Sequence, residues 1–204
     1  IKNPLTPIQL SAERIKRRFG KQITDEADRT VFDQCTDTIV RQVGDIGRMV
    51  DEFSAFARMP KPTKEMSDLR VILKDATFLR EMGAAHVSFS TELGDEPLEG
   101  MFDARMLGQA FGNLIKNATE AIDSVETGDD PRAGKILVKA FFDEENNRFV
   151  AEVIDNGRGL PVENRHRILE PYMTMREKGT GLGLAIVKKI IEEHGGHLEL
   201  HDAP

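Results

Sequence analysis

Apolar side chains in the first 58 residues recur at alternating spacings of three and four, which is the pattern of packed helices. The positions in the first segment are Leu5, Ile8, Ala12, Ile15 and Phe19, and those in the second are Phe32, Ile39, Val43, Ile46, Val50, Phe53 and Ala57. The polar stretch between them, residues 20–28, predicts an antiparallel hairpin. Two helices alone bury little apolar surface, so the pattern favours a homodimer whose hairpins form a four-helix bundle. A plain dimerisation stalk would show the same periodicity.

The pattern changes after the predicted hairpin, residues 1–58. Residues 59–66 contain Pro60 and Pro62 and predict a linker. A second domain is expected over residues 67–204, and both ends of the chain are expected to be cuts within a longer protein.

Helices and strands are expected to alternate in the second domain. Ser67 or Asp68 is predicted to cap a helix that runs to about Gly83, and Asp103 to open a longer helix that reaches about Val125. A last helix and four strands are expected over residues 180–194 and over residues 86–93, 135–142, 148–155 and 197–201. The predicted fold class is therefore α+β, with a helical hairpin followed by a sheet that carries helices on one face.

Composition narrows the classes of function. The chain has 204 residues, a net charge of -7 and a pI near 5.3, which argues against nucleic-acid binding. It has no apolar run long enough to span a bilayer, so no membrane contact is expected from it. The single cysteine, Cys35, can form neither an internal disulfide nor a zinc site with neighbouring cysteines. A reducing, cytoplasmic setting is predicted.

The first candidate cluster lies on the long helix expected after Asp103. Asn113 and Asn117 are four residues apart, so their amides share one helical face. Two neutral amides can hold Mg²⁺ and orient phosphate oxygens without adding negative charge. The alternative is a polar helix face with no ligand.

The second cluster is Asp155-Asn156-Gly157-Arg158-Gly159, directly after a predicted strand. A carboxylate at a strand end can accept a hydrogen bond from an adenine amino group, and glycines let the backbone approach the base. The alternative is an ordinary Asp-Asn-Gly turn. The pattern that follows is typical of a helix and not of a partner strand, which disfavours a simple hairpin turn.

The third cluster, Gly179-Thr180-Gly181-Leu182-Gly183, opens the last predicted helix. Glycines there leave free N–H groups at the positive end of the helix dipole, where phosphate binds readily. The preceding residues 168–178 are irregular and predict a lid, with Lys178 placed to reach a phosphate. The loop matches neither a Rossmann nor a Walker motif.

Taken together, the three clusters resemble the N, G1 and G2 boxes of the histidine kinase catalytic domain. The run Ile168-Leu169-Glu170-Pro171-Tyr172 resembles the F box before the lid. This fold, an α/β sandwich, is shared with gyrase, Hsp90 and MutL ATPases, and the resemblance covers about residue 67 to the C-terminus. It implies ATP and Mg²⁺ as cofactors.

The resemblance also assigns roles to residues. Asp155 would bind adenine, Asn117 would ligate Mg²⁺, and Asn113 would help to position the phosphates. The residues expected to contact the nucleotide are Asn117, Asp155, Gly157, Gly159, Lys178, Gly179, Thr180, Gly181, Leu182 and Gly183. The sequence departs from the family at Glu120, where many members have a phosphate-contacting lysine.

The sequence of the predicted hairpin indicates which members of this family the chain resembles. Ile1-Lys2-Asn3-Pro4-Leu5-Thr6-Pro7 resembles the tail of an H box, whose family pattern is His-Glu, an apolar residue, Lys or Arg, Asn or Thr, and Pro. The longer run to Arg14 is similar to NtrY-type nitrogen-regulation sensor kinases. In the family, Asn3 stands at a position linked to dephosphorylation of the partner regulator.

The resemblance implies the core of a two-component sensor histidine kinase. It would bind Mg-ATP, phosphorylate its own histidine, pass the phosphoryl group to an aspartate of a response-regulator receiver domain, and in some members remove it again. None of the five histidines lies in the hairpin, so the fragment is not expected to autophosphorylate at the usual site; they are His86, His166, His194, His197 and His201. The parent protein is expected to be anchored in the inner membrane with this part in the cytoplasm.

Two other classes of function stay open at this point. A chaperone- or topoisomerase-type ATPase switch needs a catalytic glutamate on the long helix, but Asn113 stands one turn before Asn117 and cannot act as a base. A non-catalytic dimerisation and docking module would need no intact nucleotide motifs. Complete motifs in the expected order argue against it.

Overall fold

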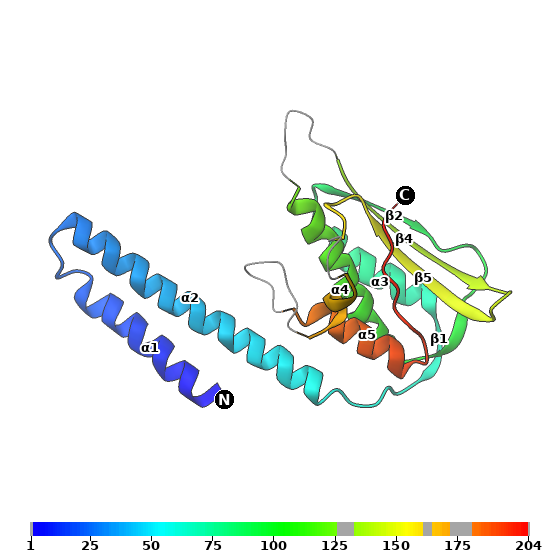
Figure 1. Ribbon diagram of the computed structural model, residues 1–204, viewed down its shortest axis with the longest axis horizontal. Helices are drawn as coiled ribbons and strands as arrows, with labels where there is room; N and C mark the ends of the chain where they lie inside the picture. The colour runs from blue at the N-terminus through cyan, green and yellow to red at the C-terminus, as the bar shows by residue number, and fades with distance from the viewer. Residues whose placement is uncertain (1, 126–132, 161–164, 172–180, 204) are drawn as a thin grey trace. The chain divides into compact units, whose positions relative to one another are not determined.

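The computed structural model describes residues 2–125, 133–160, 165–171 and 181–203, and within them the side chains of residues 2–4 and 166 are not described. These residues form two compact units, one extending to Met59 and the other beginning at Pro60. Figure 1 shows the helical hairpin of the first unit and the mixed helices and strands of the second. Within the described ranges, every helix is too short or too polar to cross a membrane.

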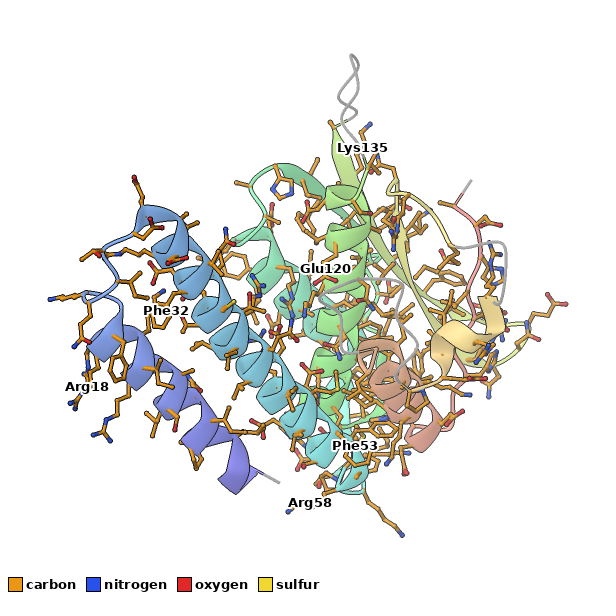
Figure 2. All side chains as sticks on the ribbon, turned by 60° about the vertical axis from the view of Figure 1, so that its left-hand side comes forward. Arg18, Phe32, Phe53, Arg58, Glu120 and Lys135 are labelled. Atoms are coloured by element: carbon orange, nitrogen blue, oxygen red, sulfur yellow. The ribbon has the colours of Figure 1, made fainter. Side chains whose placement is uncertain are left out.

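The first unit is the predicted hairpin, formed by α1 (Lys2–Phe19) and α2 (Glu26–Ala57). The connection is shorter than the predicted one because Asp25 already caps α2, its side chain accepting a hydrogen bond from the N–H of Asp28 at 3.0 Å. Near the turn, Lys16 of α1 forms an ion pair with Asp37 of α2 at 2.5 Å. Figure 2 shows Arg18 and Phe32 at this end of the hairpin.

The apolar seam of the hairpin is only partly covered by its own two helices. Ala12 and Val43 are buried, with exposed fractions of 6% and 8%. Larger residues of the same pattern remain 43–47% exposed; they are Ile8, Ile15, Phe19, Ile39, Ile46 and Phe53. An amphipathic helix of a monomeric domain normally covers such residues.

The second unit has the predicted arrangement of helices on one face of a sheet. The sheet contains β2 (Val87–Glu92), β4 (Gly134–Asp143) and β5 (Arg148–Asp155) in the order β2-β4-β5, with β2 parallel and β5 antiparallel to β4. Figure 1 shows α3 (Leu69–Glu81), α4 (Ala104–Asp123) and α5 (Gly183–Glu193) on one side of it. The largest fully buried side chains between these layers are Leu73, Met106, Ile115, Ile136, Val138, Leu182, Val187 and Ile190. The α+β fold class is confirmed.

Two carboxylates begin helices as expected from the sequence. Asp68 caps α3 by accepting from the N–H of Arg70 at 2.9 Å, which decides between Ser67 and Asp68. Asp103 caps α4 by accepting from the N–H of Met106 at 3.0 Å. A side-chain acceptor at this position satisfies N–H groups that the first helical turn leaves free.

A second, smaller sheet was not predicted. It pairs β1 (Glu65–Asp68) with β3 (Glu99–Phe102) in antiparallel register, so that Met66 lies opposite Met101. Two residues of the predicted linker, Glu65 and Met66, therefore belong to a strand. Each strand has four residues, which is too short for a clear alternation in the sequence.

Two predictions near the C-terminus differ from the structure. Residues 197–201 were expected to form a strand but adopt no regular secondary structure, because no strand of the described residues pairs with them. The last helix begins at Gly183 and not near residue 180, since Gly181 has a left-handed backbone with φ +68°. Its predicted end is confirmed: Gly195 follows His194 with φ +83°, a conformation that glycine adopts without strain.

Candidate nucleotide site

The two predicted asparagines lie on α4, the long helix at the centre of the second unit. Asn113 and Asn117 are half-buried, while Ile115 and Ala118 turn into the core. The side chain of Asn117 lies next to the first residue of α5: a Cβ atom added to Gly183 would stand 3.8 Å from its Nδ2 and 3.9 Å from its Oδ1. The first and third sequence clusters are therefore neighbours.

The N-terminus of α5 offers main-chain donors beside Asn117. The N–H groups of its first turn have no partner within the helix, and the helix dipole is positive at this end. Leu182, the N-cap residue, is fully buried and has an apolar side chain, so it cannot satisfy them as a serine or aspartate would. Anions bind favourably to such an arrangement.

Asp155 is the last residue of β5 and pairs with Ile136 of β4 in the sheet. Cross-strand partners project from the same face, so Asp155 lies on the face that the helices cover, at the edge of the core. Burial raises the pKa of its carboxyl, and a hydrogen bond from the N–H of Gly157 at 2.9 Å opposes part of this shift. A carboxylate held in this way can accept a hydrogen bond from a buried donor of a ligand.

The glycine after Asp155 brings the second cluster against α4. A Cβ atom on Gly157 would lie 2.6 Å from the carbonyl carbon of Ala121 and 2.8 Å from its Cβ, which leaves no room for a side chain. The next residue, Arg158, donates its N–H to the carbonyl oxygen of Ala121 at 3.3 Å. Gly159 then takes a left-handed backbone with φ +74°. All three clusters thus meet around α4.

Several predicted site residues cannot be compared with the structure. Lys178, Gly179 and Thr180 lie outside the described residues, as does most of the predicted lid. Its first two residues, 168–169, end a 3₁₀ helix, η1 (Arg165–Leu169). Asn3 is in α1, but its side chain is also outside the description.

Glu120, the departure from the family pattern, lies on α4 as labelled in Figure 2. Its carboxylate stands 3.7 Å from the ammonium group of Lys116, one helical turn earlier. This pair is partly exposed and therefore weak, but it balances a negative charge on the helix that carries Asn113 and Asn117.

Sequence reasoning missed two residues that shape this site. Ala121 provides both the contact surface for Gly157 and the acceptor for Arg158. The side chain of Asn156 binds the main chain at the start of β4. An asparagine directly after a strand is a signal for such a side-chain turn, whereas nothing local marks Ala121.

With this geometry established, comparison with known families identifies the class of protein. Residues 102–204 match the family of histidine kinase-, DNA gyrase B- and HSP90-like ATPases. The chain belongs to this family, whose members bind ATP.

Within the family, the resemblance to NtrY-type sensor histidine kinases is confirmed. The chain is 57% identical over 204 residues to the nitrogen regulation protein NtrY of Azorhizobium caulinodans, a match that covers 100% of this chain and 26% of the relative. It thus spans about a quarter of the length of that protein.

Two solved structures share the fold. Full-length ShkA in complex with AMPPNP has a TM-score of 0.60 and 22% identity, covering 98% of this chain and 41% of ShkA. Histidine kinase ThkA in complex with response regulator protein TrrA has a TM-score of 0.63 and 20% identity, covering 95% of this chain and 53% of that chain. At this level of identity the likeness concerns the fold.

Proposed function

We propose that the chain is the ATP-binding and dimerisation core of a sensor histidine kinase that signals to a response regulator. The observation that carries the proposal is the meeting of three distant segments around α4: Asn117 lies beside Gly183, and Gly157 packs on Ala121. Few other functions need amide side chains, a half-buried carboxylate and the first-turn N–H groups of a helix in one place.

The nucleotide would lie across these three segments. Asp155 accepts a hydrogen bond from the adenine amino group, and the first turn of α5 receives the phosphates. Burial raises the pKa of the Asp155 carboxyl, and a donor from the entering base would favour its charged form and oppose this shift. The complex of ShkA with AMPPNP supports nucleotide binding by proteins of this fold.

Asn117 and Asn113 suit a magnesium ion that accompanies a triphosphate. Their amide oxygens are hard ligands without charge, and Asn117 lies at the helix terminus proposed to receive the phosphates. When bound, Mg²⁺ neutralises charge on the phosphate oxygens during transfer. The residues of the chain position the nucleotide and keep the pocket ordered.

The exposed apolar seam of the hairpin supports a homodimer. Six large residues of α1 and α2 remain 43–47% exposed on helices whose sequence pattern predicts burial; they are Ile8, Ile15, Phe19, Ile39, Ile46 and Phe53. A second hairpin packed on this seam would complete a four-helix bundle and bury them.

The reaction transfers the γ-phosphoryl group of ATP to a ring nitrogen of a histidine and leaves ADP. The phosphohistidine then passes the group to an aspartate of a receiver domain, which docks on the hairpin around residues 5–19. Asn3 would take part in removing the phosphoryl group from that regulator. The complex of ThkA with TrrA supports docking of a regulator by proteins of this fold. ATP and receiver domains are both cytoplasmic, so this phosphoryl transfer would take place in the cytoplasm.

The proposal is tested with a chain extended upstream through the expected His-Glu pair. The extended chain, the 204-residue chain and an extended Asp155→Ala variant are incubated with γ-labelled Mg-ATP, and retained label is tested for acid lability. Acid-labile label only in the extended wild type is the expected result. Folded, dimeric proteins that take up no label would instead favour a docking module without kinase activity.

A further inference from the structure

The β4–β5 ladder ends in an unusual way next to Asp155. The last paired residues are Ile136 and Asp155, and one step further the N–H of Asn156 donates to the carbonyl oxygen of Lys135 at 3.3 Å. In a regular antiparallel pair, the N–H of Lys135 would donate back to the main chain of Asn156. It donates instead to the side-chain Oδ1 of Asn156, at 2.7 Å.

The other half of the same amide is also bound to β4. Nδ2 of Asn156 donates to the carbonyl oxygen of Ala133 at 3.0 Å. The orientation of the amide is unambiguous, because the N–H of Lys135 can only donate and the carbonyl of Ala133 can only accept. Three hydrogen bonds therefore join Asn156 to the short stretch 133–135, the start of β4 that Figure 2 marks with Lys135.

Because the side chain of Asn156 takes the place of its main-chain carbonyl in the pairing with β4, the backbone can leave the sheet at this point. With its amide holding β4, Asn156 does not need its own carbonyl for the ladder, so the chain can turn at Gly157 towards α4. There Gly157 reaches Ala121 without room for a side chain, and Arg158 binds the Ala121 carbonyl. Asp155 lies at the start of this turn and is held by the N–H of Gly157.

We propose that Asn156 is a positioning residue for Asp155, which fixes the direction of the adenine-binding carboxylate by ending the β4–β5 ladder with its side chain. The inference rests on the proposed function, in which Asp155 binds adenine. Asn156 acts through the backbone and does not contact the base, because both polar atoms of its amide are already bound to β4.

The test compares binding of two nucleotides that differ at the group Asp155 recognises. Dissociation constants for Mg-ATP and Mg-ITP, whose 6-oxo group replaces the amino group, are measured on the 204-residue wild type and on Asn156→Ala. We expect Asn156→Ala to weaken ATP binding about tenfold and ITP binding by less than about twofold, so that the preference for ATP shrinks. Asn146→Ala is the matched control, since Asn146 binds Asp143 at the opposite end of the same strands.

Two further variants separate positioning from a general loss of structure. In Asp155→Ala, the added Asn156→Ala change should leave the ATP-to-ITP ratio unaltered, because the carboxylate to be positioned is gone. Asn156→Asp keeps the acceptor for Lys135 but loses the donor to Ala133, and an intermediate ratio is expected. Asn156→Asp also takes the place of Asn156→Ala in the comparison of ATP with ITP if Asn156→Ala does not fold.

The outcomes distinguish this inference from the function on which it rests. Equal weakening of ATP and ITP by Asn156→Ala would mean a merely structural role and overturn the inference. The inference would also be overturned if Asp155→Ala abolishes the preference for ATP while Asn156→Ala and Asn156→Asp retain it. If Asp155→Ala itself leaves the ratio unchanged, the adenine role of Asp155 fails and the inference falls with it.

Discussion

The main-chain N–H of Asp103 donates a hydrogen bond to Nε2 of His194 across 3.0 Å and so joins the start of α4 to the end of α5. Because Nε2 accepts this bond, the ring proton is on Nδ1, which lies 2.8 Å from the carbonyl oxygen of Ile190. The carboxylate of Asp103 also receives the N–H of Thr63 at 2.9 Å. The buried residue Asp103 thus links the segment before β1 with α4 and α5, the two helices that carry the candidate site.

Replacing His194 should destabilise the second unit. His194→Ala leaves the N–H of the buried Asp103 without its acceptor, and we expect the free energy of unfolding to fall by about 1–3 kcal/mol. Urea unfolding measures the difference. His197→Ala is the control: His197 is exposed and pairs only weakly with Glu199, so its loss should change stability by less than about 0.5 kcal/mol. Similar values for both variants would contradict the structural role of His194.

Asp68 should make stability depend on pH in the acid range. Its hydrogen bonds with the Arg70 side chain, and further with the N–H groups of Arg70 and Leu98, hold the pKa of its carboxyl at about 2 against the opposing effect of burial. Since this value lies below that of the unfolded chain, the stabilisation is complete above about pH 4 and is lost as pH falls towards 2.

Asp68→Asn keeps the cap of α3 but loses the charge, so it isolates this effect. We expect the wild type to exceed Asp68→Asn in unfolding free energy by about 1–2 kcal/mol at pH 6, and the difference to shrink at pH 3. Denaturant unfolding at both pH values is the measurement. A difference that does not change with pH would show that the ion pair with Arg70 contributes nothing to folding.

Two glycine variants test the close approach of the second cluster to α4. In Gly157→Ala, the new Cβ would lie 2.6–2.8 Å from Ala121 and from Oδ1 of Asp155, so the turn must move away from the helix. We expect a loss of about 1–3 kcal/mol in stability and at least about tenfold weaker ATP binding. Both quantities are accessible by urea unfolding and calorimetric titration.

The control for this variant is Gly108→Ala on the same helix α4, where an added Cβ meets no atom within 4 Å. Alanine favours the helical backbone over glycine, so Gly108→Ala should stabilise the protein by about 0.5–1 kcal/mol and leave ATP affinity unchanged. Unaltered ATP binding by Gly157→Ala would argue that the turn does not form part of the nucleotide site.

Asp155→Asn should raise stability while it lowers ATP affinity. The folded pKa of Asp155 is raised by burial, so the folded protein binds its proton more tightly and stability declines as pH rises through the window above the unfolded value. At pH 7 the charged carboxylate is therefore unfavourable. The uncharged amide should gain up to about 1 kcal/mol, limited because water screens the half-buried group.

The amide oxygen of Asp155→Asn can still accept the N–H of Gly157, so the turn should be preserved. Unfolding and ATP titration on the same sample measure the two effects. A variant that binds ATP as well as the wild type would contradict the role of Asp155 as the acceptor of the adenine amino group. Stability that falls in the variant would contradict the direction of the pKa shift.

Local chemistry explains which elements were predictable. Asp68 and Asp103 were expected to begin helices because a side-chain acceptor before an apolar helical pattern is a local signal, and both do so. The strand predicted over residues 148–155 was also right, because its own residues favour an extended chain. By contrast, β1 and β3 have four residues each and depend on pairing between residues 31–37 positions apart, which no local pattern reveals.

The strand predicted over residues 197–201 shows the converse error. His197, Glu199 and His201 alternate with two leucines, and alternation is the strongest local sign of a strand. A strand also needs hydrogen bonds to a neighbour, and the sheets described here provide none for these residues. The alternating pattern alone therefore does not show whether a segment will pair in a sheet.

The candidate site was predictable in its parts but not in its assembly. The sequence motifs pointed to Asn117, Asp155 and the glycines that open the last helix. That Asn117 lies beside Gly183, and that Ala121 receives the turn after Asp155, follow only from the packing of α4 against α5 and β5. An asparagine directly after a strand indicates a side-chain turn, but the three bonds of Asn156 to residues 133–135 follow only from the folded structure.

The order β2-β4-β5 leaves β5 at the margin of the sheet, with one row of main-chain N–H and C=O groups unmatched by any strand of the described residues. Its sequence, Arg148-Phe149-Val150-Ala151-Glu152-Val153-Ile154-Asp155, is rich in residues that favour extended pairing. Such a margin is a template for pairing with another strand, and it is distinct from the hairpin seam through which a dimer is proposed. Pairing of two β5 margins uses both of them and stops at two copies, so the observation of a dimer would not by itself distinguish this contact from the proposed hairpin bundle.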